Sequence, residues 1–394
     1  MSHPVSRLMN SIYECKKAIG LVSISLNQYI IVQEITNGYR RILIRKYIAF
    51  SAIHYLVNIN TPERAMSLLK RSLLCSSLLI TNAAVAAPNQ PVTVADGINI
   101  VGSQKVSFHN GTIIMAANLY PAIVVSHPWG GVKEQASGLY AQQLAKRGFI
   151  TLAFDASHYG ESGGVPRDLE NPADRVQDIR SAVGYLSNLP QVDDSRIGTL
   201  GICAGGGYTL HEAQSDLRVK AVAGVVTYDI GEATRTGIEE LPIGEADRQK
   251  LLQSVDEQLN KEAAGSPVLI QQLLPSRNTL NDSTPNFVRE ATDYYLTPRG
   301  AHPNAHNRYV MTSPGLHMAY YPLAHMDQIA PRSVLLITGE KAETRKFSQQ
   351  AYDNAKQPKE LVVIPGASHF DLYDKPQFVS PAIDKLAAFF TKNL

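Results

Sequence analysis

The chain has 394 residues, and its 37 lysines and arginines against 35 aspartates and glutamates give a formal net charge of +2. With 44% hydrophobic and 18% charged residues, the composition is ordinary for a globular protein and excludes a low-complexity or strongly basic chain. The length allows two or three domains, although α/β chains often run long as one.

The segment 66–86 has the pattern of a secretory signal peptide. It begins with Met66 and a basic pair, continues as a short apolar stretch, and ends in an Ala-x-Ala cleavage site at Ala86. Because export signals begin at the first methionine, we expect translation to start at Met66, with residues 1–65 an upstream extension. The alternative is a real, poorly packed N-terminal segment. The signal predicts a periplasmic or secreted protein.

Cleavage after Ala86 changes the charge and the cysteine count. The remaining chain holds 27 basic and 32 acidic residues, a net charge of −5. This balance argues against nucleic acid as a partner and against an anionic membrane, and cleavage leaves no membrane anchor. Cys15 and Cys75 leave with the N-terminus, so Cys203 would be the single cysteine and no internal disulfide is expected.

From Gly97 onward, strand-like and helix-like runs alternate along the chain. The expected strands are Lys105–His109, Gly111–Ala116, Ala122–Ser126, Phe149–Phe154, Arg196–Ile202, Val219–Val226, Val334–Thr338 and Leu361–Ile364. The expected helices are Ala136–Arg147, Asp174–Leu189, Gly206–Ser215, Thr344–Ala355 and Ala382–Lys392. Strands rich in Val, Ile and Leu, separated by helices, predict an α/β fold with a doubly wound, mostly parallel sheet.

The alternation breaks between Tyr228 and Pro331. This region of about a hundred residues is polar, with one long helical pattern at Glu245–Ala263 and several Pro and Gly breaks. We expect residues 87–394 to form one α/β domain in which residues 228–331 are a helical cap that shapes a substrate pocket.

Gly201-Ile202-Cys203-Ala204-Gly205 follows a strand-like run and precedes a helix-like one. Small residues on both sides of a central nucleophile permit the sharp strand-to-helix turn of a nucleophile elbow. The central residue here is a thiol. Cys203 is therefore the candidate nucleophile.

A cysteine nucleophile needs a base and a group that orients the base. His369 follows the last expected strand, where a triad in the order nucleophile, acid, histidine places its base. We expect Glu343 to be the acid, with Glu340 as the alternative, because no aspartate follows the preceding strand. A solvated helix start would also favour Glu at these positions. His158 is a competing base, but it precedes the nucleophile.

An oxyanion hole needs two backbone N–H groups that point at the developing charge. Ala204, directly after the nucleophile, should supply one. Trp129, in the glycine-containing loop after the strand Ala122–Ser126, should supply the other. The Trp129 ring could equally serve as a pocket wall.

No cofactor is expected, because the chain has neither a P-loop nor a dinucleotide fingerprint. His302 and His306 have the spacing of a helical metal-binding pair, yet Pro303 lies between them and no carboxylate completes a ligand set. Solvated or hydrogen-bonded histidines are the simpler interpretation, and we predict no metal.

The segment Gly201 to Gly206 reads G-x-C-x-G-G and resembles the elbow of the dienelactone-hydrolase-like branch of the α/β-hydrolase superfamily. The resemblance runs from about Val101 to the C-terminus and includes the segments around Trp129, His158 and His369. Some similar proteins are acyl hydrolases and others polyketide acyl transferases. Two features depart from that family, which usually has Asp as its acid and a much smaller cap.

Together these features predict an exported, Cys-dependent hydrolase of carboxylic esters, lactones or thioesters, with a small-molecule acyl substrate as its partner. An acyl transferase of the same fold is one alternative. The other is a non-catalytic α/β-hydrolase-like binding protein.

Overall fold

The computed structural model describes residues 29–36, 39–48, 51–57, 104–189 and 192–394. The chain divides into two units, residues 1–91 and 92–394. In the first unit, three antiparallel strands pair in the order β1-β2-β3; they are β1 (Tyr29–Thr36), β2 (Tyr39–Ile48) and β3 (Ser51–Val57). The predicted signal peptide, residues 66–86, lies outside the described residues, and the origin of residues 1–65 stays a prediction.

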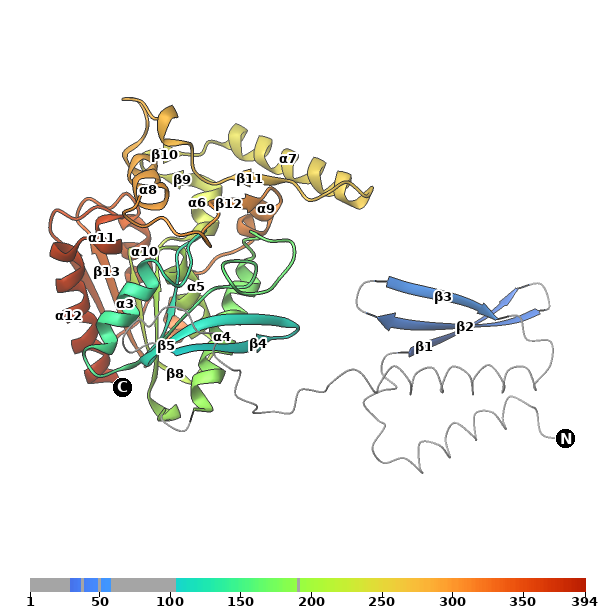
Figure 1. Ribbon diagram of the computed structural model, residues 1–394, viewed down its shortest axis with the longest axis horizontal. Helices are drawn as coiled ribbons and strands as arrows, with labels where there is room; N and C mark the ends of the chain where they lie inside the picture. The colour runs from blue at the N-terminus through green and yellow to red at the C-terminus, as the bar shows by residue number, and fades with distance from the viewer. Residues whose placement is uncertain (1–28, 37–38, 49–50, 58–103, 190–191) are drawn as a thin grey trace. The chain divides into compact units, whose positions relative to one another are not determined.

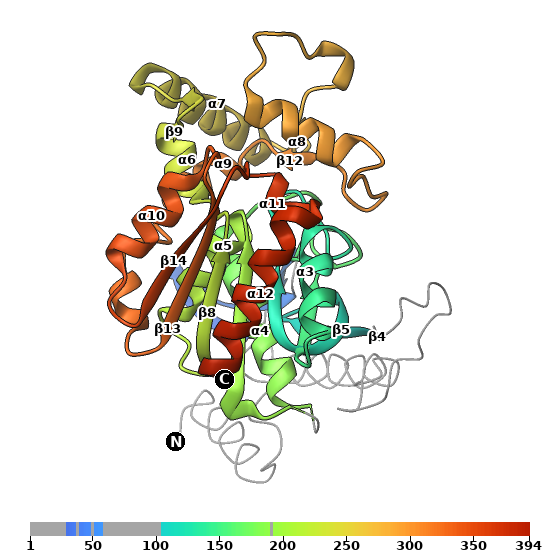
Figure 2. The same cartoon turned by 90° about the vertical axis from the view of Figure 1, so that its left-hand side faces the viewer.

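A seven-stranded sheet forms the centre of the second unit (Figures 1 and 2). Its order is β14-β13-β8-β7-β5-β4, with β6 paired to β5. Strands β5, β7, β8, β13 and β14 are parallel, whereas β4 is antiparallel to β5. The strands are β4 (Gln104–Asn110), β5 (Ile113–Ser126), β6 (Ile150–Phe154), β7 (Ile197–Ile202), β8 (Val219–Val225), β13 (Ser333–Gly339) and β14 (Lys359–Ile364). The predicted α/β fold with a mostly parallel sheet is confirmed.

Helices flank this sheet. Helices α3 and α12 pack against each other and against strands, and α4 and α5 form a second such pair. The helices are α3 (Ala136–Ala145), α4 (Pro172–Ser187), α5 (Ala204–Ala213), α10 (Arg345–Asn354), α11 (Asp371–Asp374) and α12 (Pro376–Asn393), with the 3₁₀ turn η2 at Asp194–Arg196. Among the described residues, no helix is both long and apolar enough to cross a membrane.

One strand differs from its prediction. Gly111–Ala116 and Ala122–Ser126 were expected as separate strands, but β5 runs without a break from Ile113 to Ser126. Its first half pairs with β4 and its second half with β7, and register shifts against β6 occur between Pro121 and Val125. Pro121 therefore lies at an irregular point of the pairing between β5 and β6, where the strand can accommodate it.

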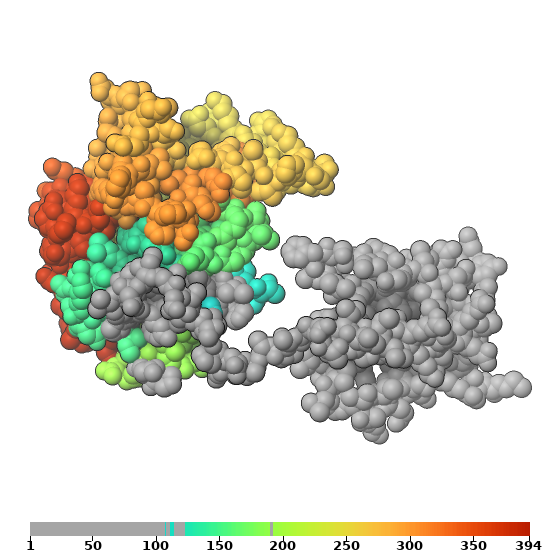
Figure 3. Space-filling model, in the orientation of Figure 1, coloured from blue at the N-terminus to red at the C-terminus, as the bar shows by residue number. Residues whose placement is uncertain are grey.

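Helices, 3₁₀ turns and short strands fill the connection between β8 and β13. They gather on one side of the unit, beyond the end at which β8 leads into α6 (yellow to orange in Figures 1 and 3). They are α6 (Ile230–Thr236), β9 (Gly237–Ile238), β10 (Leu241–Pro242), α7 (Glu245–Ala263), β11 (Ile270–Gln272), η3 (Arg277–Thr279), α8 (Asn286–Leu296), β12 (Arg308–Val310), α9 (Ser313–Met318) and η4 (Met326–Ile329).

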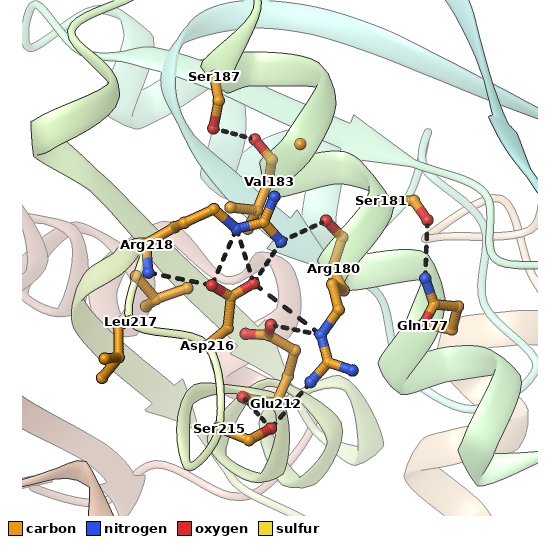
Figure 4. Close-up of polar contacts among 12 residues, drawn as sticks. Gln177, Arg180, Ser181, Val183, Ser187, Glu212, Ser215, Asp216, Leu217 and Arg218 are labelled. Carbon is orange, nitrogen blue, oxygen red and sulfur yellow. Dashed lines mark hydrogen bonds and ion pairs between the residues drawn. The ribbon is translucent and has the colours of Figure 1, made fainter.

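A polar cluster joins α4 to the end of α5 (Figure 4). Arg180 on α4 approaches Glu212 on α5 at 3.6 Å and Asp216 at 4.0 Å, and Asp216 also pairs with Arg218. Burial, together with the neighbouring Asp216 carboxylate, raises the pKa of the Glu212 carboxyl to about 8. Glu212 is therefore protonated at neutral pH, which lets two carboxyl groups lie together in this packed region.

Three buried histidines predict that the fold is sensitive to acid. Burial lowers the pKa of His127, of His317 and of His369, and for His317 and His369 the value falls to about 3. His127 Nδ1 hydrogen-bonds the Pro128 carbonyl and its Nε2 accepts from Ala156 N, a pattern that needs a neutral ring.

Below the ordinary histidine pKa of 6.5, the unfolded chain takes up protons on these three side chains, whereas the folded protein keeps the rings neutral. At these three sites the unfolded state then binds more protons, so their contribution to stability is complete above 6.5 and is lost as the pH decreases. We expect the melting temperature to fall steadily between about pH 6.5 and pH 4.5. A melting temperature that is flat across this range would contradict the prediction.

Candidate active site

Cys203 lies in a strained turn between β7 and α5. Its backbone angles are φ 58° and ψ −125°, a left-handed combination that non-glycine residues rarely adopt. Three backbone hydrogen bonds hold this conformation: Cys203 N donates to Val225 O at 3.0 Å, and Cys203 O accepts from Gly206 N and from Tyr228 N, each at 2.9 Å. The strand-to-helix turn predicted from the sequence is present. It places Cys203 between β7 and α5, outside both elements.

The glycines beside Cys203 are required by space. A Cβ on Gly201 would lie 2.1 Å from the carbonyl oxygen of Gly205, and a Cβ on Gly205 would lie 2.4 Å from the carbonyl oxygen of Ser126. No side chain fits at these distances from backbone atoms. The helix start and the two strand ends therefore approach one another closely around the thiol.

Cys203 is 7% exposed, and its thiol meets three hydrogen-bonding groups. The backbone N–H groups of Ala204 and Trp129 hydrogen-bond its sulfur, and so does the hydroxyl of Tyr373. Burial outweighs these contacts and raises the pKa of the thiol to about 11. At rest the sulfur is therefore protonated, and the two amides predicted to form the oxyanion hole both converge on it.

His369 is fully buried, and hydroxyl groups contact both of its ring nitrogens. Nδ1 lies 2.6 Å from Thr344 Oγ1, and Nε2 lies 3.2 Å from the Tyr373 hydroxyl oxygen. Burial lowers the pKa of the imidazole to about 3, so the ring is neutral at rest. Because Tyr373 also hydrogen-bonds the Cys203 sulfur, one hydroxyl connects the thiol to the imidazole.

The structure does not place the Glu343 carboxylate, predicted to orient His369, beside the imidazole. Glu343 Oε1 accepts a hydrogen bond from Asn286 Nδ2 at 2.9 Å, and its Oε2 is buried without a hydrogen-bond partner among the described residues. The alternative, Glu340, accepts from Gly366 N at 2.7 Å. The position next to Nδ1 belongs to Thr344, the residue directly after Glu343.

His158, the competing base, lies in a different environment. Its Nδ1 contacts the Pro166 carbonyl at 2.8 Å and its Nε2 lies 3.3 Å from Asp174. The pair considered for a metal also has other partners. His306 Nδ1 lies 2.9 Å from Asp168, and His302 Nδ1 lies 3.9 Å from Glu134.

Three carboxylates elsewhere in the described residues have a spacing that a metal could use. Glu134, Asp155 and Glu161 place oxygens within 4.8 Å of one another. The ammonium group of Lys133 lies between them, at 2.8, 2.7 and 2.6 Å. This buried ammonium supplies the positive charge that the cluster requires.

The loop that carries Trp129 is anchored from α4. Arg175 is fully buried, and its Nη2 donates to the carbonyl oxygen of His127 at 2.5 Å, while its Nη1 pairs with Glu170 at 3.1 Å. Glu170 also accepts from the Tyr208 hydroxyl at 2.7 Å. Arg175 thus fixes the backbone two residues before the Trp129 amide, and its charge lowers the pKa of the thiol.

A hollow of about 500 Å³ shares one residue, Tyr295, with the surroundings of this site. Tyr295 lines it and also hydrogen-bonds Tyr373, which links its wall to the thiol's neighbours. The lining is mostly apolar and comes from α8 and the loop after it: Tyr295, Leu296, Ala301, His302, Pro303, Ala305 and Asn307.

Sequence reasoning missed Thr344, Tyr373 and Arg175. A spacing signal was present for Tyr373, since positions four apart lie on one face of a helical turn, and Tyr373 is four residues after His369. Thr344 and Arg175 carry no such signal, because the site residues they contact, His369 and His127, lie 25 and 48 positions away.

Comparisons with known proteins agree with this fold. The model of the dienelactone hydrolase family matches residues 110–240. The uncharacterised protein PA2218 of Pseudomonas aeruginosa is 42% identical over 308 residues, 75% of this chain and 81% of that protein. The PA2218 crystal structure superposes with a TM-score of 0.71 at 38% identity, over 78% of this chain and 100% of that one.

Two fungal proteins are more distantly similar. A thiohydrolase of Eupenicillium brefeldianum is 24% identical over 287 residues, 72% of this chain and 89% of its own. The α/β hydrolase GrgF of Penicillium sp. sh18 has a TM-score of 0.62 at 20% identity, over 74% of this chain and 99% of its own, and so shares the fold. The chain is therefore a hydrolase that belongs to the dienelactone hydrolase family of α/β hydrolases.

Proposed function

We propose that this chain cleaves carboxylic esters, lactones or thioesters through an acyl-enzyme formed on Cys203. The observation that supports the proposal is the position of the thiol, held on a strained elbow where two backbone N–H groups and the Tyr373–His369 pair meet. A carbonyl carbon attacked by this sulfur would leave its oxygen beside the Ala204 and Trp129 amides, which suit an oxyanion hole.

The resting site holds a neutral thiol and a neutral imidazole. The pKa of the thiol, about 11, lies far above that of His369, about 3, so no thiolate–imidazolium pair forms in advance. The sulfur must then lose its proton as it attacks, with His369 as the final acceptor. Returning that proton to the leaving group releases the alcohol or thiol, and water hydrolyses the acyl-enzyme by the same route.

Thioesters are the first substrates to test. A thiolate is itself a good leaving group, so a tetrahedral intermediate on Cys203 goes forward when the departing group is also good, as in activated esters and thioesters, and returns when it is an amine. The similarity to a thiohydrolase supports the same choice. The mostly apolar hollow next to Tyr295 suits the acyl chain.

The test compares wild type and Cys203→Ala on a panel of short-chain thioesters and p-nitrophenyl esters. We expect wild type to gain the mass of one acyl group on the peptide that contains Cys203, and Cys203→Ala to lose at least about 10³-fold in kcat. Equal rates for the two proteins would rule out the enzyme mechanism and favour a binding protein. Added alcohols or amines that capture the acyl group would show a transferase.

Export is a second part of the proposal and rests only on the pattern of residues 66–86. N-terminal sequencing of the protein recovered from the producing cells tests it. A mature protein that begins at Ala87 is expected, and one that begins well before it would contradict export through this signal.

A further inference from the structure

We infer that the Tyr373 hydroxyl is a catalytic group that carries the proton between the Cys203 sulfur and Nε2 of His369. The inference rests on the proposed function, because it names the path of the proton that Cys203 must lose. It adds a fourth group to the nucleophile, base and oxyanion amides.

The geometry places one oxygen atom between the two reacting groups. The Tyr373 hydroxyl hydrogen-bonds the Cys203 sulfur and lies 3.2 Å from His369 Nε2. Within the described part of the chain, the hydrogen-bond partners of the His369 ring are Thr344 and Tyr373. The route from thiol to imidazole that the hydrogen bonds provide therefore passes through the phenol.

The tautomer of His369 sets the direction of transfer. A neutral ring that accepts at Nε2 carries its hydrogen on Nδ1 and donates it to Thr344 Oγ1, 2.6 Å away. The Tyr373 O–H can then donate to Nε2, while its oxygen accepts from the thiol S–H. Thr344 is thus a positioning residue that keeps Nε2 free to accept.

The proton balance of the acylation step is complete without further groups. As sulfur bonds to the carbonyl carbon, the S–H proton passes to the Tyr373 oxygen and the Tyr373 proton passes to Nε2. The products are an oxyanion, a neutral phenol and an imidazolium. Collapse of the intermediate reverses both transfers, so the imidazolium proton reaches the leaving group through the phenol and Cys203 stays acylated.

The two transfers should occur together. Burial and the nearby Cys203 raise the pKa of the Tyr373 hydroxyl well above its ordinary value, so a free tyrosinate is costly at this position. A concerted transfer avoids that charge, since the phenol receives one proton as it gives up the other.

Packing holds the Tyr373 ring independently of its hydroxyl. Its ring centroid lies 4.9 Å from that of Phe370, 5.0 Å from Tyr294 and 5.4 Å from His369. The hydroxyl itself contacts Cys203, His369 and Tyr295, a residue of the hollow's wall. Removing the oxygen alone should therefore interrupt the proton path and leave the ring in place.

The test is Tyr373→Phe, with Tyr294→Phe as the matched control. Tyr294 packs edge-on against Tyr373 but does not share its hydrogen bonds to Cys203 and His369. We expect Tyr373→Phe to lower kcat for a thioester about 10²- to 10⁴-fold, with KM and melting temperature little changed, and Tyr294→Phe to stay within about threefold of wild type.

A proton inventory measures the rate in mixtures of H₂O and D₂O. Its shape would not change if Tyr373 had only a structural role. Wild type should show a curved plot for two protons in flight, and residual activity of Tyr373→Phe a linear plot with a smaller isotope effect. A linear wild-type inventory, or Tyr373→Phe within threefold of wild type, would overturn the relay.

Two further results distinguish the relay from a folding defect and from failure of the proposed function. If Tyr373→Phe does not fold, difluorotyrosine at position 373 retains the hydroxyl with a lowered pKa. The relay then predicts a changed rate and pH profile in a folded protein, and unchanged kinetics would overturn it. If Cys203→Ala is inactive while Tyr373→Phe is fully active, the proposed function stands and the relay alone fails.

Discussion

His369→Gln is expected to lower kcat/KM for a short-chain thioester about 10³-fold, whereas Glu343→Gln should leave it within about threefold of wild type. In the proposed mechanism, the imidazole of His369 is the final proton acceptor. Glu343 hydrogen-bonds Asn286 and does not contact the ring. Steady-state kinetics of the two variants, with melting temperatures to confirm folding, check the difference.

Two variants of Thr344 provide a matched comparison for this prediction. Thr344→Val keeps the shape of the side chain but removes the partner of His369 Nδ1, and should lower kcat about tenfold or more with little change in KM. Thr344→Ser restores the hydroxyl and should recover most of the rate. A loss in Glu343→Gln as large as that in His369→Gln would show that the carboxylate orients the ring.

Arg175→Met should have the largest effect on stability, a loss of about 3–5 kcal/mol. The buried guanidinium pairs with Glu170 and holds the His127 carbonyl, so its removal leaves a buried carboxylate without its charged partner. We expect kcat to fall as well, because the Trp129 amide loses the anchor of its loop. Urea unfolding measures the free energy of unfolding directly.

Arg196→Met is the control for Arg175→Met. Arg196 pairs with Asp193 at 2.7 Å, but both side chains are exposed, at 62% and 44%, so the loss should stay below about 1 kcal/mol. Adding Glu170→Gln to Arg175→Met removes the unpaired charge and should recover part of the stability. Similar free energies of unfolding for Arg175→Met and Arg196→Met would contradict the assigned role.

The residues proposed as nucleophile, base and oxyanion amides could be picked out from the sequence because each lies next to a local signal. Cys203 sits between glycines that the elbow needs, Ala204 follows it, and His369 follows the last strand of an alternating pattern. The orienting group was not accessible. The prediction assumed a carboxylate, and the structure places the neutral hydroxyl of Thr344 one residue beyond it.

The sequence by itself determined the alternation of strands and helices, the elbow and the family, since these depend on hydrophobic periodicity and on turn residues that act over a few positions. Only the tertiary structure decided which groups share the buried site. Tyr373 contacts Cys203, which is 170 positions away in the sequence, and Arg175 contacts His127, which is 48 positions away. The neutral state of thiol and imidazole likewise follows from burial, which is a property of the folded chain and not of any motif.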